Sequence, residues 1–88
     1  MRYRDQFLLL VTGYLVAAFA VQPINRAWIG VKRARQIPDD FWNGVLESEI
    51  EQLAFEFALW AVGEAHRPTW LPLTEEEERY REAQRQVR

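Results

Sequence analysis

Few side chains in this chain of 88 residues have the types and spacing that catalysis or metal binding needs. His66, the single histidine, follows Glu64, but residues two apart near a helix end do not share a face, which favours a solvent-exposed histidine. Glu47 and Glu51 are four residues apart, as in carboxylate-bridged metal bundles, yet those sites also need Glu-x-x-His pairs. We interpret these glutamates as a solvated face. The sequence predicts no catalytic, cofactor-binding or metal-ligating residue, and therefore no enzyme and no cofactor.

The remaining composition narrows the possible ligands. The chain has no cysteine, which excludes disulfides and thiolate metal sites. Lys32, Arg33 and Arg35, with Arg26 one or two turns earlier, could contact phosphates, but this basic cluster is small and the net charge of the chain is −2. We therefore do not expect nucleic-acid binding, and no small-molecule substrate is evident.

The apolar run Phe7–Val21 contains no charged residue and dominates the sequence. Extended to residues 3–24, it would form a helix of about 33 Å, enough for the roughly 30 Å hydrocarbon layer of a membrane. Such a helix would be apolar on every face, as expected in lipid. The main prediction is a single transmembrane helix over residues 1–24. Gly13 and Ala17 form a small-xxx-small pair for packing against another membrane helix.

The flanks of the run leave alternatives open. Two arginines precede it and four basic residues follow it, so the positive-inside bias predicts a cytoplasmic body. The segment Ala18–Ala20 also resembles the A-x-A site of a cleaved signal peptide. In a third interpretation, the apolar helix is buried between the subunits of an oligomer.

Residues 25–37 form a basic segment. Pro23 predicts an end or a kink of the first helix, because proline lacks the backbone N–H. The helical spacing after it predicts a short amphipathic helix at the membrane surface. Alternatively, the segment continues the first helix and packs against the acidic segment. Its predicted membrane-interface residues are Arg26, Trp28, Lys32, Arg33 and Arg35.

Residues 38–66 form an acidic amphipathic segment. Pro38 and two aspartates are a helix start signal, so we predict one helix over residues 41–62, ended by Gly63. Phe55, Leu59 and Val62 make a second apolar patch on it. The main apolar face advances by three or four residues, like a coiled-coil seam that recruits a protein partner. With Trp70, the predicted interaction residues are Trp42, Leu46, Ile50, Leu53, Phe57 and Trp60.

Residues 67–88 predict a connector and a charged C-terminal helix. Trp70 could anchor the connector, and Thr74 with Glu77 has the pattern of a capping box. Glutamates and arginines four residues apart support this helix, in the pairs Glu75–Arg79 and Glu77–Arg81. The helix has little apolar surface, so we expect it to project into water or to dock on a partner.

Charge is distributed unevenly along the chain. Residues 1–35 carry six basic groups and one acid, a balance of +5, whereas residues 36–66 carry seven carboxylates and no Lys or Arg. This asymmetry predicts either internal pairing or different surroundings for the two segments.

The fold class is all-α. The predicted function is that of a small non-enzymatic single-pass membrane protein, an accessory or assembly subunit that packs its helices against lipid, other subunits or its own copies. The alternative is a soluble all-α structural or adaptor protein of a virion or another oligomeric assembly.

Overall fold

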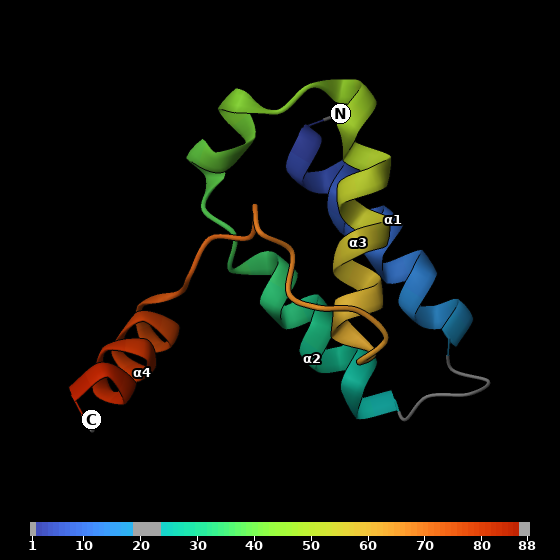
Figure 1. Ribbon diagram of the computed structural model, residues 1–88. Coiled ribbons are helices and arrows are strands. Elements are labelled where there is room, and N and C mark those ends of the chain that lie inside the picture. Colours follow the sequence, from blue (N-terminus) through green and yellow to red (C-terminus); the bar gives the residue numbers. More distant parts are fainter. Residues whose placement is uncertain (1, 19–23, 87–88) are drawn as a thin grey trace.

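The computed structural model describes residues 2–18 and 24–86, and every regular element in this part of the chain is helical (Figure 1). The predicted all-α fold is confirmed. The helices pack around one hydrophobic core, except for the last, which stands apart from the others. The elements are α1 (Tyr3–Ala17), α2 (Ile24–Arg35), the 3-10 helices η2 (Asp39–Gly44) and η3 (Glu47–Glu49), α3 (Ile50–Ala61) and α4 (Glu75–Gln86).

The apolar run builds the core of this chain. Phe7, Val11 and Leu15 recur every four residues, so they form one stripe along α1, and their exposed fractions are only 0%, 0% and 1%. The stripe packs against α3, whose buried residues are Ile50, Ala54, Phe57 and Ala58. The rings of Phe7 and Phe57 meet edge to face, with 5.7 Å between their centroids. Burial inside the chain thus accounts for the apolar character of this stripe.

The predicted membrane span requires correction. Within residues 2–18 and 24–86, no helix combines the length and the apolar character needed to cross a membrane. Helix α1 has 15 residues and covers about 22 Å, less than the roughly 30 Å of a hydrocarbon layer. The predicted membrane localisation, with its single span and cytoplasmic body, is therefore wrong. Pro23 and most of the proposed A-x-A site (Phe19 and Ala20) lie outside the described residues.

Small residues let α2 approach the other two core helices closely. Ala27, Gly30 and Ala34 form the buried face of α2. A Cβ atom placed on Gly30 would lie 2.9 Å from Leu15 Cδ1 and 3.0 Å from Ala61 Cβ. Such an atom would force the Leu15 side chain to move and would press against Ala61. Gly30 therefore sets the spacing of the three helices.

The predicted continuous helix over residues 41–62 is also wrong. Residues 39–49 form the two 3-10 helices η2 and η3, and α3 begins only at Ile50. Asn43 and Gly44 are poor helix formers, which favours an interruption there. The side-chain Oε1 of Glu49 accepts the backbone N–H of Leu46 at 3.1 Å, so this new turn has its own cap.

The ends of α3 and α4 are formed as predicted. Gly63 has φ +81°, a conformation that glycine adopts without strain, and its N–H donates to Trp60 O at 3.0 Å. The N–H of Glu64 donates to Leu59 O at 2.9 Å, which completes a Schellman motif. At the start of α4, the Thr74 N–H donates to Glu77 Oε1 at 2.9 Å, and the Glu77 N–H donates to Thr74 Oγ1 at 3.1 Å. The predicted capping box is confirmed.

Candidate interaction surfaces

The basic residues of α2 divide into two groups that face different surroundings. Arg26 and Arg33 are used inside the chain. Arg26 Nη1 donates to the carbonyl of Val62 at the end of α3, at 3.0 Å. Arg33 Nη2 donates to Pro72 O at 2.6 Å and to Glu77 Oε1 at 2.8 Å. These two arginines link α2 to α3 and to α4, although Arg26 itself stays exposed, as do Lys32 and Arg35 of the predicted basic cluster.

The outer face of α2 combines large apolar side chains with positive charge. Trp28 and Ile29 are 61% and 62% exposed, although they are among the most apolar residues of the helix. Lys32 Nζ lies over the Trp28 ring, 5.8 Å from its centroid, and Arg35 is one turn further along. We call Trp28, Ile29, Lys32 and Arg35 the basic face. Exposed apolar side chains gathered on one helix face are typical of a protein-interaction surface.

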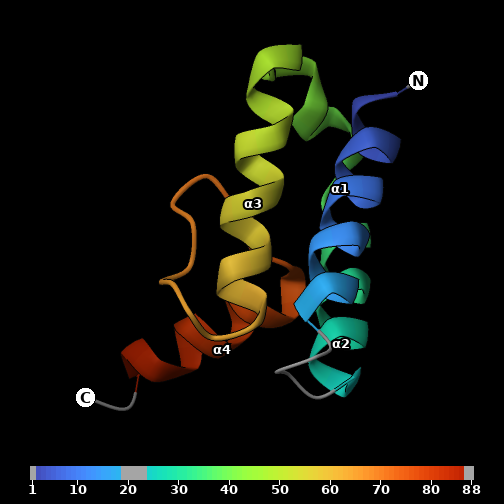
Figure 2. The same ribbon diagram turned by 90° about the vertical axis from the view of Figure 1, so that its right-hand side faces the viewer.

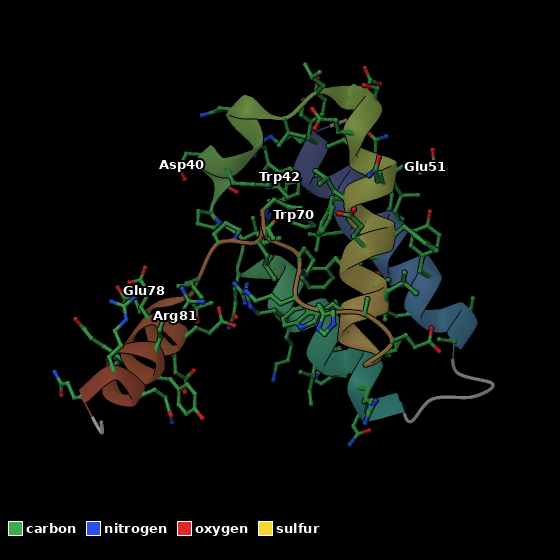
Figure 3. The ribbon with its side chains drawn as sticks, viewed as in Figure 1. Asp40, Trp42, Glu51, Trp70, Glu78 and Arg81 are labelled. Carbon is green, nitrogen blue, oxygen red and sulfur yellow. The ribbon has the colours of Figure 1, made fainter. Side chains whose placement is uncertain are left out.

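A second surface lies where α1 meets α3. The rings of Tyr14 and Phe55 meet edge to face at 5.7 Å between centroids, and Phe55 remains 50% exposed. They line an open hollow of about 430 Å³ together with Ser48, Glu51 and Gln52. Figure 3 shows Glu51 on the outer side of α3. Glu47 is exposed on the adjacent 3-10 helix η3, outside the lining of the hollow, and we call the hollow together with Glu47 the acidic hollow.

The acidic segment is not neutralised by the basic segment inside the described part of the chain. Arg4 and Asp39 form the one ion pair between residues 2–35 and residues 36–66, at 3.5 Å, and the Asp39 side chain is 84% exposed. The other two ion pairs both use Glu77, which receives Arg33 and Arg67. The charge asymmetry seen in the sequence is therefore displayed on the surface.

The predicted seam does not form one face. Ile50 and Phe57 are fully buried and Trp42 is 7% exposed, so these three side chains belong to the core of this chain. Leu53 and Trp60 are half-buried. Leu46 is 65% exposed because the predicted helix is interrupted between η2 and η3, so Leu46 does not share the buried face of α3. The second predicted patch also divides, since Val62 is buried while Phe55 is exposed.

Trp70 anchors the connector to the body of the protein. Its Nε1 donates to Glu56 Oε2 at 2.7 Å, and its ring stacks on Phe41 with 5.8 Å between centroids. Trp42, which belongs to η2, and Trp70 both pack against Phe7 and Phe41, and Figure 3 labels them close together. The predicted role of Trp70 as a packing anchor is confirmed, and its contacts are with this chain.

Gly13 and Ala17 lie on the exposed side of α1, away from the core stripe. A Cβ placed on Gly13 would have no atom within 4 Å. Leu9 and Val16 on the same side are 62% and 52% exposed. Without a membrane span, the predicted packing of this pair against a membrane helix loses its basis. The outer side of α1 is a smaller apolar surface that carries no Lys or Arg.

Glu77 is the electrostatic centre of the junction between α2, the connector and α4. Partial burial raises the pKa of its carboxyl. The Thr74 N–H, the hydrogen bond from Arg33 and the charges of Arg33 and Arg67 act in the opposite direction, and together they hold the pKa below its ordinary value. Glu77 thus binds two arginines from outside α4, in place of the predicted pairing with Arg81.

Two further hollows are lined by charged side chains and hydrogen-bonding groups. One, of about 560 Å³, lies beside α4 between Arg67, Leu73 and Tyr80, and its lining includes the carboxylate of Glu77, which is already paired with arginines. The other, of about 500 Å³, lies beside Arg2, Arg4 and Trp42. Arg4 Nε and Trp42 Nε1 have no hydrogen-bond partner there, but both atoms are shielded from solvent.

The titratable residues considered first in the sequence are all on the surface. His66, Glu64, Glu47 and Glu51 are exposed. In the described ranges, no three His, Asp or Glu side chains converge in a way that could hold a metal ion. Comparison of the chain with models of protein families, with curated proteins and with solved structures found no match.

Sequence reasoning missed part of both surfaces. The adjacent pair Trp28 and Ile29 could have indicated the basic face, because both side chains can point outward only if the small residues of α2 face the core. Tyr14 and Phe55 gave no such signal, since 41 positions separate them and only the packing of α1 on α3 brings them together.

Proposed function

We propose that this chain is a small all-α structural or adaptor subunit that acts by packing its exposed helix faces against other protein chains. The proposal gives it no catalytic role. The observation that carries it is the basic face of α2, where Trp28 and Ile29 are more than half exposed. Each side chain would gain roughly 1.5–3 kcal/mol on full burial. Exposing these two side chains to water costs free energy in an isolated chain. Burying them in an interface with another chain would recover that free energy.

The completeness of the core supports the same proposal. The buried stripe of α1 is covered by α2 and α3 of the same chain, so the fold does not need Trp28 or Ile29 for its own packing. These two side chains can therefore be buried against a partner without unfolding any helix. The α2 backbone that carries them is fixed by Gly30, Arg26 and Arg33, and a fixed surface binds at a lower cost in entropy.

Site-specific photo-crosslinking in the native cells tests this proposal. A photoreactive phenylalanine analogue replaces Ile29 on the basic face, and a matched variant carries it at Arg79, an exposed position of α4. We expect discrete protein adducts from position 29 and at least about tenfold fewer from position 79. Equal yields at the two positions, or no protein adduct at position 29, would overturn the proposal.

A further inference from the structure

The two surfaces described above are complementary in charge, and both have an apolar centre. The basic face presents an aromatic ring, an aliphatic side chain and two cationic groups, Lys32 and Arg35. The acidic hollow presents two aromatic rings and the carboxylate of Glu51, and Glu47 is exposed beside it on η3. Opposite charge around an apolar centre is the usual arrangement of a specific protein interface.

We propose that the partner of the basic face is the acidic hollow of a second copy of this chain. This inference rests on the proposed function and names its partner. Trp28 of one copy packs on the Tyr14–Phe55 pair at the acidic hollow of the next copy. Lys32 and Arg35 then face Glu51 and Glu47.

The residues at the hollow suit a tryptophan. Tyr14 and Phe55 already form an edge-to-face pair, and an incoming indole ring extends it to three aromatic side chains. Gln52 and Ser48 at the same hollow can accept the indole N–H. The Lys32 ammonium lies over Trp28, so the ring and the positive charge arrive together.

The charge balance of the chain favours its own copy as partner. Six of the seven carboxylates in residues 36–66 belong to no ion pair in the described part of the molecule, and neither do Lys32 and Arg35. Contact between copies would bring the two unneutralised sets together. A surface of this size and polarity fits weak, salt-dependent association.

The positions of the two surfaces determine the kind of assembly. Seen from the side of α1 and α3, α2 lies behind them (Figure 2). The basic face lies on α2, whereas the acidic hollow is lined by residues of α1, η3 and α3, so the two copies in contact use different surfaces. The contact is therefore head to tail, and a pair of copies keeps one free surface of each kind. Such contacts form rings or extend into filaments.

Charge reversal separates the two surfaces experimentally. The variant K32E/R35E destroys the basic face, and E47K/E51K destroys the acidic hollow. All four residues lie at the surface, so both variants should keep the helical circular dichroism of the wild type. In sedimentation at concentrations from about 10 µM to about 1 mM, the wild type should exceed the mass of a dimer, and each variant should remain a monomer.

Mixing the two variants gives the sharpest outcome. Every contact between the two variants then pairs opposite charges, so the mixture should regain the association of the wild type while each variant alone stays a monomer. The control R79E/R85E makes the same charge change on exposed residues of α4 and should associate like the wild type. Raising NaCl from about 50 mM to about 500 mM should weaken wild-type association at least about threefold.

A monomeric wild type at all concentrations would overturn self-association, as would a mixture that stays monomeric or a control that is equally impaired. The proposed function is tested separately, by the crosslinking at position 29. If the wild type is monomeric but position 29 still crosslinks selectively to other proteins, the adaptor proposal stands without a second copy. If position 29 gives no adduct, both proposals fail.

Discussion

The guanidinium of Arg33 on α2 binds the carboxylate of Glu77 on α4, with 2.8 Å between Nη2 and Oε1, although 44 positions separate the two residues. Arg67 binds the other oxygen of the same carboxylate at 3.2 Å. Helix α4 buries none of its described side chains, so this junction and the connector hold it beside the body. The placement of α4 is decided by polar contacts, in contrast to the apolar packing of α1, α2 and α3.

Replacing Glu77 by glutamine should loosen α4. The Glu77→Gln side chain keeps an oxygen for the Thr74 N–H but loses the charge that binds Arg33, whose side chain is only 11% exposed. We expect a loss of about 1–2 kcal/mol in the free energy of unfolding and faster amide hydrogen exchange along α4. Glu78→Gln, the same change at the next residue on the exposed side of α4, is the control and should have little effect. Equal effects of the two substitutions would contradict the role of the junction.

The same junction should respond to pH. Because the pKa of Glu77 is lower in the folded protein than in the unfolded chain, its contribution is complete above the pKa of the unfolded chain. The contribution is lost as the pH falls through the lower folded value. In urea unfolding at a series of pH values, the difference between wild type and Glu77→Gln should be constant near neutrality and shrink in acid. A difference that grows on acidification would contradict the direction of the shift.

One substitution, glycine to alanine, should have opposite effects on α1 and α2. Gly13→Ala points into open space and gains helix propensity, so it should stabilise the protein by about 0.5–1 kcal/mol. Gly30→Ala places its Cβ against Leu15 and Ala61 inside the core, and overpacking should outweigh the same gain by about 1 kcal/mol. Thermal unfolding compares the two variants directly. A stabilising Gly30→Ala would show that α2 is less tightly packed than described.

Two residues of the predicted seam should differ sharply in their effects on stability. Phe57 is fully buried against Phe7, so Phe57→Ala should cost about 3–5 kcal/mol. Leu46→Ala should cost less than about 0.5 kcal/mol because Leu46 is 65% exposed. If Phe57→Ala does not fold, Phe57→Leu gives a smaller loss that can be measured. Similar costs at both positions would support the continuous helix that the sequence predicted.

The hydrogen bond of Trp70 should be separable from its packing. Trp70→Phe removes the 2.7 Å bond from Nε1 to Glu56 but keeps an aromatic ring against Phe41. We expect a loss of about 1–2 kcal/mol in urea unfolding, because the acceptor is a carboxylate. In the double variant with Glu56→Gln, the second change should add little, since the two residues share one contact. Fully additive losses would show that the bond contributes nothing to stability.

The local features of this protein could be predicted from its sequence. Helical periodicity predicted the all-α class, Gly63 predicted the end of α3, and Thr74 with Glu77 predicted the cap of α4. Each of these depends on side chains and backbone groups within a few residues of one another, so their physics is contained in a short stretch of chain.

Whether each apolar or charged side chain is buried or exposed depends instead on tertiary packing. The composition of residues 7–21 suits a membrane or a protein core, and the packing of α3 and α2 on one stripe of α1 selects the core. Likewise, Arg26 and Arg33 donate hydrogen bonds to other segments while Lys32 and Arg35 point into solvent, although all four belong to one basic cluster in the sequence. These outcomes depend on neighbours that are dozens of positions away, and a local pattern holds no information about which of its faces those neighbours will cover.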